Sequence, residues 1–86
     1  MSPEIEVRIV RNGSNSVVHL EGNINGKTSH EVRAAILELL EKGCEERVIV
    51  DLKAAEQIDS MGASILVEGL EVAEKRKVDF ILTGLN

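Results

Sequence analysis

The order of hydrophobic patterns along the chain constrains its fold more than any other feature of the sequence. Residues 28–42 and 60–76 carry apolar side chains at helical spacing, so each segment is expected to form an amphipathic helix. Segments typical of strands lie around them, over residues 5–20, 47–52 and 79–83. The pattern predicts the order β-β-α-β-α-β, in which helices connect parallel strands.

The first strand segment contains a turn and is expected to form an antiparallel hairpin. Apolar side chains alternate over residues 5–9, and the pair Asn12-Gly13 tolerates the positive φ of a tight turn. Further along, residues 48–50 are apolar on both faces, as in a central strand. We therefore predict an α/β fold with a mixed four-strand sheet and both helices packed on one face.

Short patterns predict where the helices begin and end. Thr28 and Glu31 have the spacing of a capping box, in which each side chain satisfies a free backbone N–H. Gly43 stands where a C-terminal cap is expected. Residues 54–57 are predicted to be a connection that leads into the second helix.

Length and charge limit the functions that the chain can serve. At 86 residues it is expected to form a single domain over residues 1–86. A net charge of -5 without a basic stripe argues against nucleic-acid binding. No apolar run approaches the ~20 residues of a membrane span, and no signal peptide is recognised. The single cysteine, Cys44, suits a reducing compartment, so we expect a cytoplasmic protein with no nucleic-acid and no membrane partner.

The sequence also lacks the residue patterns of common enzymes. Its two histidines, His19 and His30, and its one cysteine do not have the spacing of metal ligands. Neither of the glycine-rich motifs that cradle phosphates is present. We therefore expect no metal site and none of these catalytic motifs.

One segment has the features of a modification or anion site, and it spans residues 58–64 at the start of the second helix. A helix N-terminus presents free N–H groups and a positive dipole end, so it holds anions. Ser60 is expected to be exposed there, whereas Ser64 lies one turn further in, where its hydroxyl can bond a carbonyl one turn back. A structural alternative stays open, in which Asp59 or Ser60 only caps the helix and Gly62 is needed for close packing.

The segment and the predicted topology together resemble the STAS domain, and more narrowly the bacterial anti-sigma factor antagonists. The family pattern has a strand that ends in Val-Asp-Leu, here residues 50–52, followed by Asp-Ser-Ser/Ala-Gly-Leu-Gly at a helix start, here residues 59–64. Residues 20–25 resemble the family's Gly-x-(Leu/Ile/Val)-Asp element, with Asn25 where the family often carries aspartate. The resemblance covers about residues 5–83.

The resemblance implies that Ser60 is phosphorylated by a partner that is both an anti-sigma factor and a serine kinase. The unphosphorylated antagonist binds that partner and frees the sigma factor, the phosphorylated form does not bind, and a PP2C-type phosphatase resets the switch. The resemblance therefore implies a binding module rather than an enzyme, and no cofactor is expected because the nucleotide belongs to the partner. The residues expected to form the switch and the partner-binding site around Ser60 are Asn25, Asp59, Met61, Gly62 and Ser64.

Two other functions remain open at this point. The first alternative to the antagonist is a STAS subunit of a larger signalling scaffold. The second is a STAS domain that binds a small ligand, with an anion held by the loop and the helix N-terminus. Neither the sigma factor nor the kinase can be named from the sequence.

The last feature is the position at which the chain stops, just after the final predicted strand. STAS domains continue with a terminal helix, so we expect that helix to be missing here, in a truncated domain or an unusually short member. Its absence is expected to leave apolar surface near Phe80 and Leu82, which favours a homo-oligomer.

Overall fold

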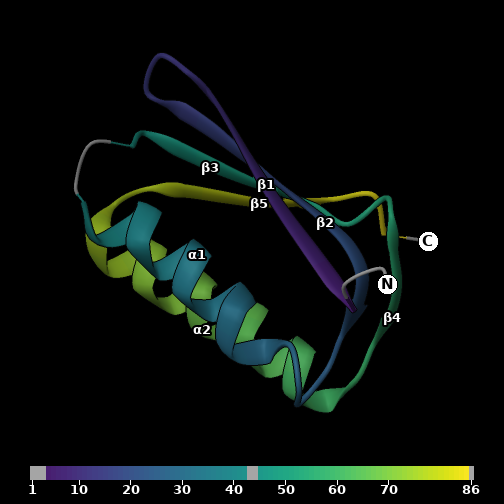
Figure 1. The fold of residues 1–86 in the computed structure, drawn as a ribbon. Coiled ribbons are helices and arrows are strands. Elements are labelled where there is room, and N and C mark those ends of the chain that lie inside the picture. The colour runs from purple at the N-terminus through teal and green to yellow at the C-terminus, as the bar shows by residue number, and fades with distance from the viewer. Residues whose placement is uncertain (1–3, 43–44, 86) are drawn as a thin grey trace.

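The computed structural model describes residues 4–42 and 45–85, and within these ranges strands and helices alternate along the chain (Figure 1). Among the described residues, neither helix has the length and the hydrophobicity required to cross a lipid bilayer. In chain order the elements are β1 (Ile5–Asn12), β2 (Asn15–Ile24), α1 (Ser29–Glu41), β3 (Arg47–Asp51), β4 (Ala55–Ile58), α2 (Ser60–Arg76) and β5 (Asp79–Thr83).

All strands of the described residues belong to one mixed sheet. The strand order is β1-β2-β3-β5, and β4 pairs with β2. β1 and β2 form the predicted antiparallel hairpin, in register from Ile5 opposite Gly22 to Asn12 opposite Asn15. β3 runs parallel to both β2 and β5. The predicted α/β fold with a mixed sheet is therefore confirmed.

β4 is a correction to the predicted four-strand sheet, because residues 54–57 were predicted to be a connection. β4 runs parallel to the end of β2, with Ile24 opposite Ile58. Its sequence, Ala-Glu-Gln-Ile, is short and half-buried or exposed throughout, so it carries no periodic signal. β2 makes the strand possible because it is 10 residues long. It pairs with β3 over residues 15–19 and with β4 over residues 22–24, where the β4 register shifts between Gly22 and Asn23.

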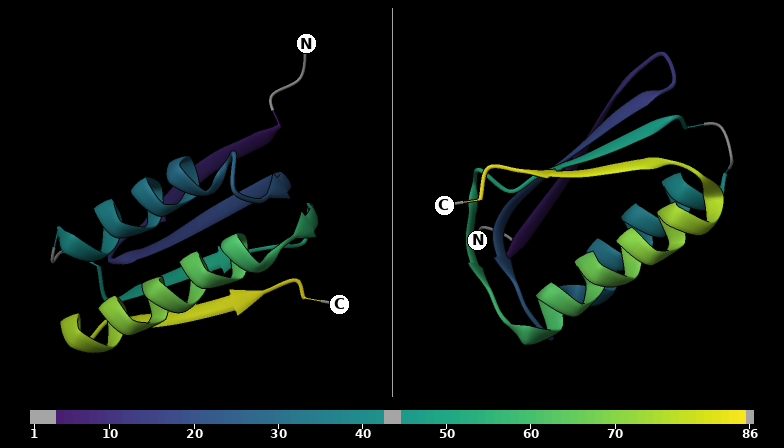
Figure 2. Two further views of the ribbon diagram at one scale, coloured as in Figure 1. Left: turned by 90° about the horizontal axis from the view of Figure 1, so that it is seen from below. Right: turned by 180° about the vertical axis from the view of Figure 1, so that it is seen from behind.

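Both helices pack against the same face of the sheet, as predicted, and they lie side by side (Figure 2). The core between the two layers is aliphatic. Arg33 on α1 and Glu68 on α2 fasten the helices with a two-point ion pair, in which Nε and Nη2 each lie 2.9 Å from a carboxylate oxygen. The hydrogen bond from Arg33 lowers the pKa of Glu68. The most deeply buried apolar side chains are Val18, Leu20 and Ile24 of β2, Val48 and Val50 of β3, and Val32, Ile36, Leu39 and Leu40 of α1.

The predicted capping box of α1 is wrong, although Thr28 is the N-cap residue. Its side chain makes no capping hydrogen bond. Instead the Thr28 hydroxyl donates to the Asn23 carbonyl at 2.8 Å and accepts from the Asn25 N–H at 2.9 Å. The hydroxyl therefore holds the preceding loop rather than the helix. The predicted cap at Gly43, like Cys44, lies outside the described residues.

β5 forms one edge of the sheet and is less exposed than expected. Phe80 and Leu82 point toward the helices and are half-buried against the core, while Ile81 points to the opposite face and is 38% exposed. The apolar surface expected at Phe80 and Leu82 is therefore only partial.

Candidate functional site

Residues singled out in the sequence meet at one corner of the molecule, where β2 and β4 end and both helices begin (Figure 1). Ile24 and Ile58 are register partners in adjacent parallel strands, so the residues that follow them emerge side by side. The Asp59 N–H donates to the Ile24 carbonyl at 3.1 Å. This bond ties the end of β2, and with it Asn25, to the start of α2.

Asp59 is the N-cap residue of α2. Its Oδ1 accepts a hydrogen bond from the Gly62 N–H at 2.9 Å, and its carbonyl accepts the first helical bond from Ala63. A carboxylate at this position satisfies one of the free N–H groups and also lies at the positive end of the helix dipole. Of the two cap residues left open by the sequence, the geometry selects Asp59.

Ser60 is the first residue of α2, and its side chain is exposed. Within the part of the chain that the structure describes, its hydroxyl makes no hydrogen bond. Ser64 differs, because its hydroxyl donates to the Ser60 carbonyl at 2.8 Å, one turn back, as predicted. Of these two serines, Ser60 therefore has the hydroxyl that is free to react.

Gly62 is buried, and its N–H is already used by the cap. A Cβ at this position would overlap the carbonyl oxygen of Ile24 and would lie 2.8 Å from the Ile24 Cγ2. The glycine thus permits close contact between the first turn of α2 and the end of β2. Gly62 is therefore needed for close packing, and it does not serve to expose backbone N–H groups to solvent.

Asn25 organises the loop between β2 and α1. Its Oδ1 accepts hydrogen bonds from the backbone N–H groups of Lys27 and Thr28, at 2.9 and 3.2 Å. Its Nδ2 donates to Glu4 at 2.8 Å. An aspartate here would accept the same two backbone bonds but would lack the donor to Glu4, so asparagine suits the loop at least as well.

Apolar side chains extend the corner onto the outer surface of α2. Met61 is 53% exposed, Val67 55% and Leu70 49%. Ser60 and Val67 are two helical turns apart, so they project on the same side of the helix. The free hydroxyl of Ser60 therefore adjoins an exposed, partly apolar helix face.

We expect removal of the Asp59 cap to weaken α2 measurably. Replacing Asp59 with Ala leaves the Gly62 N–H without its acceptor and should lower the free energy of unfolding by about 0.5–2 kcal/mol. Asp59→Asn keeps a side-chain oxygen and should lose less than half of that amount. Urea denaturation of both variants measures the difference, and equal losses would show that the hydrogen bond is not what Asp59 contributes.

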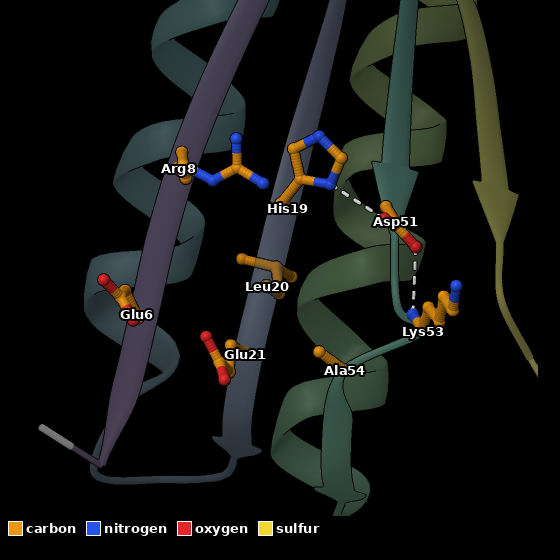
Figure 3. A pocket seen from close by; sticks show the side chains of 8 residues that line it. All are labelled: Glu6, Arg8, His19, Leu20, Glu21, Asp51, Lys53 and Ala54. Atoms are coloured by element: carbon orange, nitrogen blue, oxygen red, sulfur yellow. Dashed lines mark hydrogen bonds and ion pairs between the residues drawn. The ribbon is translucent and has the colours of Figure 1, made fainter. Parts of the chain in front are cut away.

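A cavity of about 200 Å³ lies elsewhere, and no sequence pattern predicts it (Figure 3). It opens on the face of the sheet away from the helices, beside the point where β2 changes its neighbour from β3 to β4. No group of three or more metal-binding side chains occurs among the described residues, here or elsewhere. The lining residues are Glu6, Arg8, His19, Leu20, Glu21, Asp51, Lys53 and Ala54.

His19 and Asp51 form one wall of this cavity. The Nδ1 of His19 lies 2.7 Å from Oδ2 of Asp51, and Oδ1 of Asp51 accepts from the Lys53 N–H at 3.0 Å. The bond from the Lys53 backbone and the bond from His19 lower the pKa of Asp51. Asp51 is therefore a carboxylate that fixes the orientation of the imidazole.

The chain is similar to several known proteins. The sequence profile of the STAS domain matches residues 6–86. An anti-sigma factor antagonist from Mycobacterium paratuberculosis has 26% sequence identity and a TM-score of 0.84, over 94% of this chain and 68% of that one. The Bacillus antagonist SpoIIAA, unphosphorylated, has 18% identity and a TM-score of 0.79, over 95% of this chain and 74% of that one. Part of Mglu shares the fold at 24% identity, with a TM-score of 0.77 over 87% of this chain and 18% of that one.

Proposed function

This chain belongs to the STAS domain family, and we propose on that basis that it is an anti-sigma factor antagonist switched by phosphorylation of Ser60. In its unphosphorylated form it binds an anti-sigma factor that is also a serine kinase, and so releases the sigma factor in the cytoplasm. The observation that carries the proposal is the Ser60 hydroxyl, which is exposed and makes no hydrogen bond within the described chain, at the first residue of α2.

Similarity to known antagonists supports the proposal. The antagonist from Mycobacterium paratuberculosis is similar over 94% of this chain. The fold also matches SpoIIAA in its unphosphorylated and phosphorylated forms about equally, with TM-scores of 0.79 and 0.78. A fold compatible with both forms suits a switch that acts on a contact surface rather than on the fold.

The outer face of α2 is the proposed contact surface for the kinase. Met61, Val67 and Leu70 supply exposed apolar area, and Ser60 lies at its edge. Val67 lies on the same side of α2 as Ser60, while Met61 and Leu70 lie at the two margins of the exposed face, so a partner that covers this face contacts all three. The kinase holds ATP, and the Ser60 hydroxyl oxygen takes the γ-phosphoryl group as ADP leaves.

The phosphate changes binding through charge and size. It adds about 1.5–2 negative charges beside Asp59. The backbone N–H groups of Ser60 and Met61 have no partner among the described residues, so the helix start accommodates the new charge. The contact surface is then altered while the fold persists, and a PP2C-type phosphatase restores the binding form by hydrolysis.

Phosphosite mapping tests this proposal. The chain is incubated with candidate anti-sigma kinases and ATP, and the products are analysed by mass spectrometry. We expect one phosphate, on Ser60, that is absent from Ser60→Ala and still present in Ser64→Ala. A phosphate on Ser64 instead, or none with any kinase of this class, would contradict the proposal.

A further inference from the structure

We propose that the cavity on the open face of the sheet binds a small linear zwitterion, with a primary ammonium group at one end and a carboxylate at the other. The cavity shares no lining residue with the corner around Ser60, so this inference is independent of the antagonist function. It rests on the arrangement of charges that the strand register imposes.

The first observation is a pair of like charges. Glu6 on β1 and Glu21 on β2 are direct register partners, so both side chains project from the same face of the sheet. Like charges directly opposite each other destabilise a strand pair. Within the described ranges, neither carboxylate has an ion-pair partner. Both side chains are exposed to solvent, and a ligand cation between them would relieve their repulsion.

The second observation is an unused guanidinium close by. Arg8 follows Glu6 by two residues on the same face of β1, about 7 Å along the strand. Arg8 takes part in no ion pair among the described residues, and its side chain extends toward His19 (Figure 3). Lys53, the other cation of the lining, also makes no ion pair among these residues, whereas Asp51 is held by His19 and by the Lys53 N–H. The cavity thus has a negative pole at the two glutamates and positive groups at Arg8 and Lys53.

The third observation is that the wall next to Arg8 is fixed. His19, the register partner of Arg8, is held by its bond to Asp51, and Asp51 is held by the Lys53 N–H. Preformed polar groups that converge on a cavity are typical of ligand sites. A lone anion would meet the glutamates and a metal ion would meet Arg8, whereas a molecule with both charges satisfies both poles.

The volume sets the size of the ligand. About 200 Å³ is below the usual size of ligand pockets, so a compound of a few carbon atoms is the one to test. γ-Aminobutyrate carries its ammonium group and its carboxylate at the two ends of a short carbon chain and serves as the probe. Butyrate and butylamine have the same carbon chain and only one charge each, so they are the matched controls.

Titration of the ¹⁵N-labelled chain, followed by NMR, tests the inference. We expect γ-aminobutyrate to shift amide signals of the cavity residues with a dissociation constant of about 1–10 mM. Butyrate and butylamine should bind at least about tenfold more weakly, because each leaves one pole unpaired. Equal binding of the three compounds, or no shift at the cavity, would overturn the inference.

Two variants and a control complete the test. Arg8→Gln and Glu21→Gln should each weaken γ-aminobutyrate binding by about tenfold, while Glu56→Gln, an exposed change on β4, should leave it unchanged. Glu21→Gln should also unfold at a slightly higher temperature than the wild type, because it removes the like-charge pair. If Glu21→Gln binds γ-aminobutyrate more weakly and is also more stable than the wild type, misfolding does not explain the loss of binding. Binding that survives both cavity variants would rule out this site.

Discussion

Replacing Gly62 with Ala is expected to lower the free energy of unfolding by about 1–3 kcal/mol, since the new Cβ overlaps backbone atoms that cannot move alone. The Cβ would overlap the Ile24 carbonyl oxygen and lie 3.1 Å from the Ile24 carbonyl carbon. That carbonyl also accepts the Asp59 N–H, so relief of the overlap would disturb the N-cap and the β2–α2 contact together. Urea denaturation at neutral pH measures the loss.

Gly69→Ala is the matched control for this prediction. Gly69 is also buried in α2, but the nearest atom to its added Cβ is Cζ of Phe80, at 2.9 Å, which belongs to a side chain that can shift. The higher helix propensity of Ala, up to about 1 kcal/mol, offsets the crowding. We therefore expect Gly69→Ala to lie within about 0.5 kcal/mol of the wild type. Similar losses in the two variants would show that the contact with Ile24 is not what requires Gly62.

Elements defined by side-chain periodicity could be predicted from the sequence. The alternation over residues 5–9 and the apolar stripes of the two helices report directly which side of each element faces the core. A cap at the start of α2 and the hydrogen bond from the Ser64 hydroxyl to a carbonyl one turn back could also be predicted. In both, the bonded residues are at most four positions apart in the sequence. Short sequence patterns therefore predict hydrogen bonds between residues that are close in the chain.

Features that depend on the partner strand could not be predicted in this way. β4 forms because β2 extends past β3 and has unpaired backbone groups there. The sequence Ala-Glu-Gln-Ile contains no pattern that predicts this pairing. The Thr28 hydroxyl bonds Asn23 because the loop folds back on itself. The cavity depends on the register that places Glu6 opposite Glu21, and periodicity indicates the face of a residue but not its register partner.

Replacing Ser60 with Asp is expected to weaken binding to the anti-sigma kinase by about 100-fold, or about 3 kcal/mol, if the proposed switch is correct. The new carboxylate lies beside Asp59 at the edge of the exposed helix face, where it mimics part of the charge of a phosphate. The fold should remain intact, because a negative charge is favourable at a helix N-terminus. Calorimetry with a non-hydrolysable ATP analogue measures the affinity without modifying the wild-type chain.

Ser60→Asn and Ser60→Ala separate the contributions of charge and size. Asn has the shape of Asp without its charge, so Ser60→Asn should lose far less affinity, and Ser60→Ala should bind within about threefold of the wild type. Because charge repulsion at an exposed edge is screened by salt, the gap between the Asp and Asn variants should narrow as the ionic strength rises. Equal losses for Asp and Asn at every salt concentration would mean that bulk, not charge, blocks the contact. Unchanged affinity in all three variants would place Ser60 outside the kinase interface, and its free hydroxyl would then have no part in a switch.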